Sequence, residues 1–589
     1  MDEQKRFVLA MVLSGLIMAG YYYFFAIPAQ KQAERIAAEQ AATQTQTEAP
    51  KVFEPKPRSE LVAQNKRIQI DTPSLHGSFQ TKGMRFDDIE LKNYKKTIKK
   101  DSPNVTLLTP KGAEHGAEIF DNWIRQGGGT GLDTDWVVVN GDRLTPDSPV
   151  LLRYDGDGFT VERKISIDDK FLITLEDTLT NTSDRQISLV HKGASRQYGL
   201  PEELTNLYII QEGPIAILDG VTQKIKYRSL ASRKKKGKGG ISETGTAGWV
   251  GLTDRYWLTA VIPEQGKQIK ADLRMLNLDG RDVYEAAYSQ EPLLLSPGKS
   301  INSKGYIFTG AKQHSLLKAY TDKEGISRLD LAVDYGRLGI LAKPMSWALT
   351  RLGQLTGNFG IGILILVLIV KIFLFPLNNK AYASMAKMKA VQPKLKKLQA
   401  RYGEDRMKLQ QETMALYRKE GVNPVAGCLP MIPQMFVFLA LYKSLFITME
   451  MRHAPFFGYL KDLSAKEAEQ GVSILNGLGL LPWDAVPSPA LSILALGPLA
   501  LLYGLTMALM QTLNTPPADK TQARIMQFMP IMFMFIMAGF ASGLLLYWVW
   551  NNVLTLIQQY YITRKYKVET PLDGFLKKIF GKGKAPAEK

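Results

Sequence analysis

The chain has 589 residues, of which 45% are hydrophobic and 22% are charged, and its formal net charge is +18. This length leaves room for roughly three or four domains, which excludes a single small binding module. The single cysteine, Cys428, excludes an intrachain disulfide and a multi-cysteine metal site, and the apolar and aromatic content excludes a mostly disordered chain.

The first apolar segment is Phe7–Ile27, which has no charged residue and follows Lys5 and Arg6. A membrane-spanning helix needs roughly 20 apolar residues, whereas the core of a signal peptide needs about 7–15. We therefore predict an uncleaved transmembrane anchor over residues 1–28, with a cleaved signal peptide as the alternative. Residues 29–58 lose this apolar pattern and predict a flexible linker.

Residues 59–326 consist of short runs of alternating apolar and polar residues, separated by Gly, Asp, Asn and Pro. This pattern is typical of an all-β sandwich with many strands. The clearest runs are Arg67–Asp71, Asp135–Val139, Phe159–Ile167 and Phe171–Leu179.

Residues 327–355 change to helical spacing of apolar and charged residues, interrupted at Lys343-Pro344. The pattern predicts an amphipathic helix, or a broken pair, lying in a membrane interface. The alternative is a helix packed on the β domain.

The last part of the chain is mostly apolar and predicts further membrane spans. Residues 526–562 are too long for one upright span and contain the turn-forming sequence Gly539–Gly543, which divides them into two helices near residue 542. With the anchor, the prediction is a polytopic α-helical membrane protein of six spans with a five-helix core and a large all-β external domain. The other predicted spans are 356–378, 425–447 and 490–510.

Basic residues predict the orientation of these spans. The loop 379–424 has eleven Lys and Arg against four acids, the tail 563–589 has eight against three, and the loop 448–489 has three against five. The positive-inside rule therefore places 379–424, 511–525 and the tail in the cytoplasm. Six spans then place the N-terminus inside as well, and the β domain and the loop 448–489 outside.

The loop 379–424 itself has helical spacing and predicts a helical hairpin that is basic and rich in methionine. Methionine-rich surfaces adapt to many partners, which favours a docking site for an acidic or apolar partner. The alternative is a hairpin that only confers solubility. The predicted docking residues are Lys387, Met388, Lys389, Lys394 and Arg401.

Polar residues inside the predicted spans are the strongest functional signal. Lys371 interrupts an apolar stretch about 9 Å from the cytoplasmic end of its span. A cation within the bilayer costs roughly 2.5–3.5 kcal/mol on insertion scales, which favours a position facing water. The alternative is that Lys371 extends to the cytoplasmic surface. Gln434, next to Met435, lies about 14 Å into its own span.

The last span carries polar residues at steps of three and four. Unpaired amides are costly in lipid, so this stripe is expected to face protein or water, with ordinary interhelical hydrogen bonding as the alternative. Together with Lys371 and Gln434, the stripe predicts a hydrated groove with one positive charge. The predicted spans after the β domain contain no Asp or Glu, which argues against a cation-coupled transporter. The stripe consists of Tyr547, Trp548, Asn551, Thr555, Gln558 and Gln559.

A family resemblance runs through residues 355–565. Its motifs are Val370-Lys371 with Phe375-Pro376-Leu377, Ser384–Lys389, Gln392-Pro393-Lys394, Met414–Tyr417, Val422-Asn423-Pro424, Gly427–Pro430, Phe438–Tyr442, Phe528-Met529-Pro530 and Ser542-Gly543-Leu544. In this order they resemble the YidC/Oxa/Albino family of membrane insertases. The first span and the large external domain are similar to the Gram-negative form, in which that domain is a periplasmic β-supersandwich similar to sugar-mutarotase folds.

The resemblance implies a membrane protein insertase and chaperone of the bacterial inner membrane, not an enzyme, with no cofactor. It implies that nascent membrane proteins are its substrates and that its partners are the Sec translocon with its accessory subunits, the ribosome and the signal recognition particle receptor. Anionic phospholipid is a further expected partner of the basic tail. The alternative function is a solute transporter with an external sugar-binding domain.

The family's groove cation, usually Arg, matches Lys371. Lysine keeps the charge but lacks the bidentate fork of arginine and is more readily neutralised when desolvated. The groove glutamine matches Gln434, the groove aromatics match Tyr547 and Trp548, and a threonine of some members falls at Val367. The expected groove set is Lys371, Gln434, Met435, Tyr547, Trp548, Asn551, Thr555 and Gln558.

Overall fold

The computed structural model describes residues 53–205, 209–402, 405–421, 431–477, 496–514 and 520–566, together with Thr570 and Asp573. It divides into two compact units, whose described residues are 53–55 with 277–282 in one, and those of 56–276 and 283–573 in the other. The predicted anchor over 1–28 and residues 29–52 of the predicted linker lie outside the described residues. So do residues 422–424 of the predicted hairpin, residues 425–430 and 490–495 of two predicted spans, and most of the basic tail.

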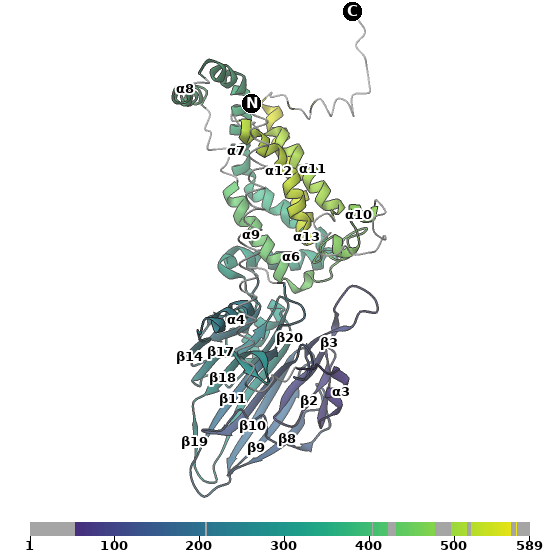
Figure 1. Ribbon diagram of the computed structural model, residues 1–589, viewed down its shortest axis with the longest axis vertical. Coiled ribbons are helices and arrows are strands. Elements are labelled where there is room, and N and C mark those ends of the chain that lie inside the picture. Colours follow the sequence, from purple (N-terminus) through teal and green to yellow (C-terminus); the bar gives the residue numbers. More distant parts are fainter. Residues whose placement is uncertain are drawn as a thin grey trace, which may run out of the picture. The chain divides into compact units, whose positions relative to one another are not determined.

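After the short helix α3 (Arg58–Ala63), the chain forms two sheets that enclose a common apolar core (Figure 1). The 11-stranded sheet has the order β14-β17-β18-β11-β5-β3-β2-β1-β7, with β19 paired to β11 and β4 paired to β3. Its strands are β1 (Arg67–Asp71), β2 (Leu75–Gln80), β3 (Arg85–Lys95), β4 (Asn104–Leu108), β5 (Ala117–Arg125), β7 (Arg143–Leu144), β11 (Ile187–Tyr198), β14 (Ile241–Gly245), β17 (Ile269–Leu278), β18 (Arg281–Gln290) and β19 (Leu293–Leu295).

The 9-stranded sheet has the order β13-β12-β15-β16-β20-β10-β9-β8-β6. Neighbouring strands in it are antiparallel. Its strands are β6 (Val137–Asn140), β8 (Val150–Gly156), β9 (Phe159–Ile167), β10 (Leu172–Asn181), β12 (Gly213–Leu218), β13 (Val221–Lys224), β15 (Gly248–Thr253), β16 (Trp257–Ile262) and β20 (Ser300–Ala311). The helix α4 (Tyr227–Lys235) lies between β13 and β14 in the chain.

The predicted β pattern is confirmed. The runs Arg67–Asp71 and Phe159–Ile167 are β1 and β9, and the other two predicted runs overlap β6 and β10 with ends shifted by one or two residues. In β9, alternate residues from Phe159 to Ile167 are buried in the core, as a half-buried strand requires. One of these inward positions is Arg163, which is completely buried.

The segment from β20 to the first long helix differs from its prediction. The helix α5 (His314–Glu324) is followed by two 3₁₀ turns, η2 (Leu329–Ala332) and η3 (Gly336–Leu338), and the amphipathic helix α6 (Gly339–Thr356) begins only there. The predicted break at Lys343-Pro344 is wrong, because α6 continues through Pro344. Proline removes one helical bond, to the carbonyl of Ile340, and Ile340 is 90% exposed, where a solvent group can replace that bond.

The helix α7 (Phe359–Tyr402) is continuous, so the segment predicted as a span and the first helix of the hairpin form one helix that includes Pro376 and Pro393. The second hairpin helix is α8 (Arg406–Lys419). Further along the chain are α9 (Met431–Ile447), the 3₁₀ turns η5 (Met449–Met451) and η6 (Ala468–Gln470), α10 (Ile474–Gly477), α11 (Pro498–Leu513), α12 (Lys520–Ala538) and α13 (Ser542–Lys565).

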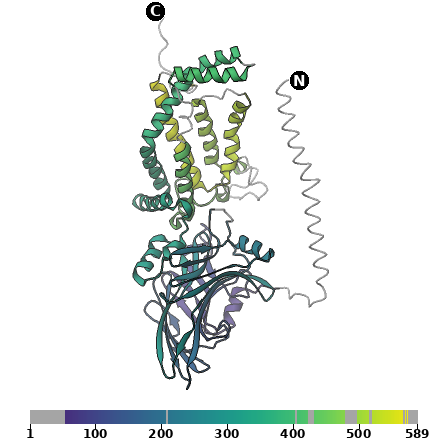
Figure 2. The ribbon, with the colours of Figure 1, turned by 90° about the vertical axis from the view of Figure 1, so that its left-hand side faces the viewer.

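The helices α11, α12 and α13 lie side by side in both ribbon views (Figures 1 and 2), and α13 also packs against α7. Their apolar core includes Leu366, Leu441, Tyr503 and Leu545. Among the described helices, only α7 is both long and apolar enough to cross a membrane, while Ile432–Ile447, Pro498–Leu513 and Ala523–Ala538 are shorter apolar helices. The predicted count of six spans is therefore not confirmed by the described residues.

Candidate functional site

The centre of the candidate site is Lys371, which α7 places in the interior of the helical part with only 8% of its surface exposed. Its Nζ donates a hydrogen bond to Oγ1 of Thr555 on α13, at 2.7 Å. The Thr555 hydroxyl in turn donates to the backbone carbonyl of Asn551, at 2.7 Å. The ammonium is thus held by a neutral oxygen, and no carboxylate pairs with it in the part of the chain that the structure describes.

Gln434 of α9 completes a second polar contact beside this lysine. Its Nε2 donates to the hydroxyl of Tyr547 at 3.0 Å and to Oδ1 of Asn551 at 3.3 Å. Because Asn551 accepts from Gln434 with its side chain and from Thr555 with its backbone, one turn of α13 joins α9 to α7. Buried amides need such partners, since an unpaired one loses its hydrogen bond with water.

Lys371, Gln434, Tyr547 and Asn551 line one cavity of about 10 Å³. That volume holds about one water molecule. The apolar side of the cavity includes Val367, which lies one turn before Lys371. Four of the predicted groove residues therefore lie around one cavity, which among the described residues encloses too little space for a peptide segment.

The predicted polar stripe of the last span does not form one face. Tyr547, Asn551 and Thr555 face α7 and α9, whereas Gln559 turns to α11 and donates to Oδ1 of Asn514 at 2.9 Å. Trp548 packs between the rings of Phe438, at a centroid distance of 4.8 Å, and Tyr503, at 6.0 Å. Met435 is 57% exposed and Gln558 is half-buried, and neither lines this cavity.

Sequence reasoning missed one polar pair that joins α13 to α11. Nδ2 of Asn552 donates to Oγ1 of Thr506 at 3.2 Å, and both side chains are buried. The sequence indicated part of this pair, because the amide of Asn552 within an apolar helix requires a hydrogen-bond partner. Its neighbour Asn551 fitted the predicted stripe, and Asn552 did not.

The chain matches two family models that together cover most of its length. Residues 67–348 match the model described as "YidC periplasmic domain", and residues 351–569 match the model described as "60Kd inner membrane protein". The membrane protein insertase YidC of Maricaulis maris is 40% identical, over 98% of this chain and 98% of that protein. The chain belongs to the YidC family of membrane protein insertases.

Two further curated relatives agree with this assignment. The membrane protein insertase YidC of Caulobacter vibrioides is 38% identical over 99% of both chains, and that of Sinorhizobium fredii is 37% identical over the whole of both. A crystal structure of an active YidC insertase is 17% identical, covers 84% of this chain and 93% of its own, and has a TM-score of 0.35.

The YidC assignment establishes the general function. The chain is an inner-membrane insertase with a periplasmic domain of β-sheets and a helical C-terminal region, and it acts on nascent membrane proteins. It is not an enzyme, and the alternative of a solute transporter is not supported by these relatives.

The structure places the predicted docking residues of the YidC hairpin in different surroundings. Nζ of Lys389 donates to the carbonyl of Thr512 at 2.9 Å, near the C-terminal end of α11, where a cation is favourable. Lys394 pairs with Glu420 at 2.7 Å, which joins α7 to the end of α8. Lys387 and Arg401 are exposed and Met388 is half-buried, so only part of this set is available to a partner.

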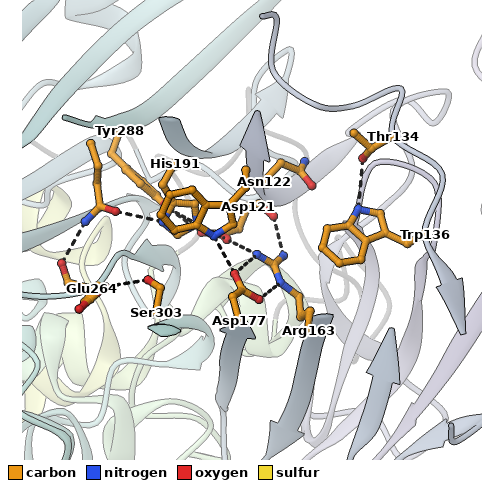
Figure 3. A network of polar contacts seen from close by, with 12 residues as sticks. Asp121, Asn122, Thr134, Trp136, Arg163, Asp177, His191, Glu264, Tyr288 and Ser303 are labelled. Atoms are coloured by element: carbon orange, nitrogen blue, oxygen red, sulfur yellow. Dashed lines mark hydrogen bonds and ion pairs between the residues drawn. The ribbon is translucent and has the colours of Figure 1, made fainter. Parts of the chain in front are cut away.

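A second polar cluster lies in the core of the periplasmic domain and joins its two sheets (Figure 3). The Arg163 guanidinium on β9 lies between Asp121 on β5 and Asp177 on β10, at 2.9 and 2.6 Å. On the other side of Asp121, Nε2 of His191 lies 2.7 Å from Oδ1 and the Tyr288 hydroxyl donates to Oδ2 at 2.5 Å. All five side chains are buried.

The spacing of Asp121, Asp177 and His191 would fit metal ligands. However, the arginine already supplies the positive charge that two buried carboxylates need, with hydrogen bonds to both. Burial alone would raise the pKa of the Asp121 carboxyl, but His191 and Arg163 outweigh burial and lower it to about 2. The cluster is therefore an ion pair network that joins the two sheets.

Proposed function

We propose that this insertase receives a short hydrophilic segment of its substrate at Lys371, in a groove that opens to the cytoplasm and to lipid. One observation carries the proposal: a buried ammonium held by the Thr555 hydroxyl at 2.7 Å, rather than by a carboxylate. A hydroxyl leaves the positive charge uncompensated, and a substrate carboxylate would then bind more strongly than in water.

The amide and hydroxyl groups around Lys371 support a guest with unsatisfied backbone. Gln434, Tyr547 and Asn551 can exchange their mutual hydrogen bonds for bonds to a peptide with little change in their number. The cavity of about 10 Å³ requires that α7, α9 and α13 separate before a segment enters. Such an opening would admit water, hydrate the inner leaflet and shorten the apolar path for the substrate.

Met435, Trp548 and Gln558 belong to the same proposed groove, at its wall rather than at its centre. Met435 is exposed on α9, where a sliding apolar segment can contact it. The driving force would be hydrophobic partitioning and the membrane potential, since the sequence has no nucleotide-binding loop.

We propose a topology of six spans, with the N-terminus, the hairpin and the basic tail in the cytoplasm. The excess of Lys and Arg in 379–424 and 563–589 supports this orientation. The exposed Lys387 and Arg401 support docking of the ribosome or the signal recognition particle receptor, and the basic tail supports contact with ribosomal RNA or anionic phospholipid. Cooperation with the Sec translocon and its accessory subunits is part of the same proposal.

The proposal is tested by depleting the protein in its own cells and measuring insertion of a short single-span substrate. Complementation by Lys371→Arg should restore insertion, because arginine keeps the charge and adds hydrogen-bond donors. Lys371→Ala should restore it weakly, and Lys371→Glu least of all. Normal insertion with Lys371→Glu would refute the groove-charge mechanism while leaving the family assignment unchanged.

A further inference from the structure

A pocket of about 400 Å³ lies beside the amphipathic helix α6, away from the proposed groove. One wall is a single face of α6 that begins at Lys343. The other residues of this face are Ser346, Trp347, Thr350, Arg351 and Gln354. The second wall is the end of α9 with η5, and the third is formed by the start of α5 and the segment before α6. The residues that matter for its chemistry are Lys343, Trp347, Thr350, Arg351, Gln354 and Glu450.

The two exposed cations of this pocket form no salt bridge with a described carboxylate. Lys343 and Arg351 lie eight residues apart on α6, or about 12 Å along its axis, and neither forms a salt bridge within the described ranges. Lys343 lies 5.6 Å from the ring centroid of Tyr335, on the other wall. The third lining lysine, Lys312, is buried and already donates to Thr253 and to the carbonyl of Asp254.

The pocket also holds a carboxylate that forms no salt bridge with a described cation. Glu450 on η5 is half-buried, and burial raises the pKa of its carboxyl. Among the described residues it has no salt bridge, although Lys343 and Arg351 line the same pocket. The pocket therefore presents positive and negative groups that form no salt bridge with each other among the described residues, which favours a ligand that carries both charges.

The surroundings of the pocket are those of a membrane interface. On α6, Ile340, Trp347 and Leu355 are 90%, 66% and 82% exposed. Exposed tryptophan is typical of the headgroup level of a bilayer, and a helix with apolar and basic faces lies in that plane. After Gly357 the chain enters α7, the most clearly membrane-spanning described helix, within two residues. The pocket is thus at the depth of lipid headgroups.

We propose that this pocket binds the headgroup of a phospholipid with a phosphate and a primary ammonium, a phosphatidylethanolamine. Lys343 and Arg351 bind the phosphate, Glu450 accepts from the ammonium, and Thr350 and Gln354 offer further hydrogen bonds. The acyl chains then cover the exposed apolar side chains of α6. Free phosphate could make only the contact with Lys343 and Arg351. It would leave Glu450 without an ammonium partner and would not cover Ile340, Trp347 and Leu355.

The test measures lipid retention by the purified full-length protein, with native mass spectrometry from detergent. Dioleoyl phosphatidylethanolamine, phosphatidylglycerol and phosphatidylcholine are added in turn at equal concentration. Phosphatidylethanolamine should be retained best, because the trimethylated ammonium of phosphatidylcholine cannot donate a hydrogen bond and phosphatidylglycerol has no cation. Equal retention of all three lipids would overturn the proposal.

Single substitutions test which charged side chain binds which part of the headgroup. Glu450→Gln should lower retention of phosphatidylethanolamine about tenfold and leave phosphatidylglycerol unchanged, since one charge-assisted bond is lost. Arg351→Gln and Lys343→Gln should each lower the retention of both phosphatidylethanolamine and phosphatidylglycerol. Arg337→Gln is the matched control, because Arg337 is exposed on η3 just before α6 but does not line the pocket. A loss as large with Arg337→Gln would show general surface attraction and contradict the site.

Two further measurements distinguish binding of the whole lipid from binding of phosphate and from a change in folding. Glycerophosphoethanolamine and inorganic phosphate are added as soluble competitors, and the proposal expects neither to displace the lipid at concentrations equal to it. Displacement by inorganic phosphate alone would indicate a phosphate site and overturn the assignment. The thermal unfolding midpoint of each variant is recorded, and Glu450→Asp, which keeps the charge, should retain phosphatidylethanolamine better than Glu450→Gln if the carboxylate rather than the fold is responsible.

Discussion

Lys371 on α7 and Thr555 on α13 are separated by 184 positions in the chain, yet the lysine Nζ lies 2.7 Å from the threonine Oγ1. This bond ties the one buried cation of α7 to the polar turn of α13 that also holds Gln434. It gives the insertase a positive charge that is buried, hydrogen-bonded and electrostatically uncompensated within the described part of the chain.

Thr555→Val should weaken this arrangement without removing the charge. The valine leaves the Lys371 ammonium without its acceptor, and a buried unsatisfied polar group costs about 1–3 kcal/mol. We expect a lower thermal unfolding midpoint of the purified protein and a partial loss of insertion. Thr563→Val is the matched control, because Thr563 is buried on the same helix and makes the same bond to the carbonyl four residues earlier. Equal effects of the two variants would contradict a specific role for the Lys371 contact.

A photoreactive residue at Met435 should cross-link to a single-span substrate stalled during insertion. Met435 is 57% exposed on α9, next to the Gln434 side chain that faces Lys371. The comparison position is Phe373 on α7, which is 80% exposed and, unlike Met435, has no immediate neighbour in the chain that lines the cavity. The cross-linked yield, measured by gel mobility and mass spectrometry, should be several times higher at Met435. Equal yields would mean that the substrate contacts the helices without preference for the groove.

Arg163→Met should destabilise the periplasmic domain by about 3–5 kcal/mol, because it leaves the buried Asp121 and Asp177 carboxylates without their cation. Denaturation followed by tryptophan fluorescence measures this directly, since Trp123 is bonded to Asp177. Lys164→Met on the same strand is the control, because its ion pair with Glu176 is exposed and contributes roughly 0–1 kcal/mol. Similar losses for both variants would contradict the assigned role of the network.

The same network predicts how the stability of the domain depends on pH. The pKa of Asp121 is about 2 in the folded protein and 3.8 ordinarily, so the folded state favours the carboxylate. Its contribution of about 2 kcal/mol to the free energy of unfolding is complete above pH 3.8 and is lost as the pH falls toward 2. Denaturation midpoints between pH 5 and 2 should fall less steeply in Asp121→Asn. An unchanged slope would show that other carboxylates dominate.

The sequence predicted which residues form the candidate site, but it did not predict which hydrogen bonds they make. An uncompensated lysine and a series of amides in apolar helices must face protein or water, which brought Lys371, Gln434 and Asn551 into one prediction. The bond to Thr555 and the turn of Gln559 toward α11 depend on how α7, α11 and α13 rotate against one another. Local periodicity carries no information on that rotation.

In the fold, too, the sequence predicted single elements but not the contacts between them. Alternation predicted β9 and put Arg163 at an inward position, but Asp121 and Asp177 come from other strands, and pairing across two sheets cannot be derived from one strand. For Pro344, the local sequence predicted a helix break that the structure does not have. The break predicted at Pro344 is wrong, because the loss of one helical hydrogen bond does not end α6.

The central claim, that Lys371 attracts negative charge on the substrate, is tested most directly by exchanging charges between the purified insertase and a single-span substrate in proteoliposomes. The insertase carries Lys371→Glu, with Lys380→Glu as control, because Lys380 is exposed on the same helix. Lys371→Glu should reduce insertion of a substrate with an acidic tail about tenfold or more, and a basic tail should restore it. Equal insertion of both substrates by Lys371→Glu and by the unaltered protein would contradict the account.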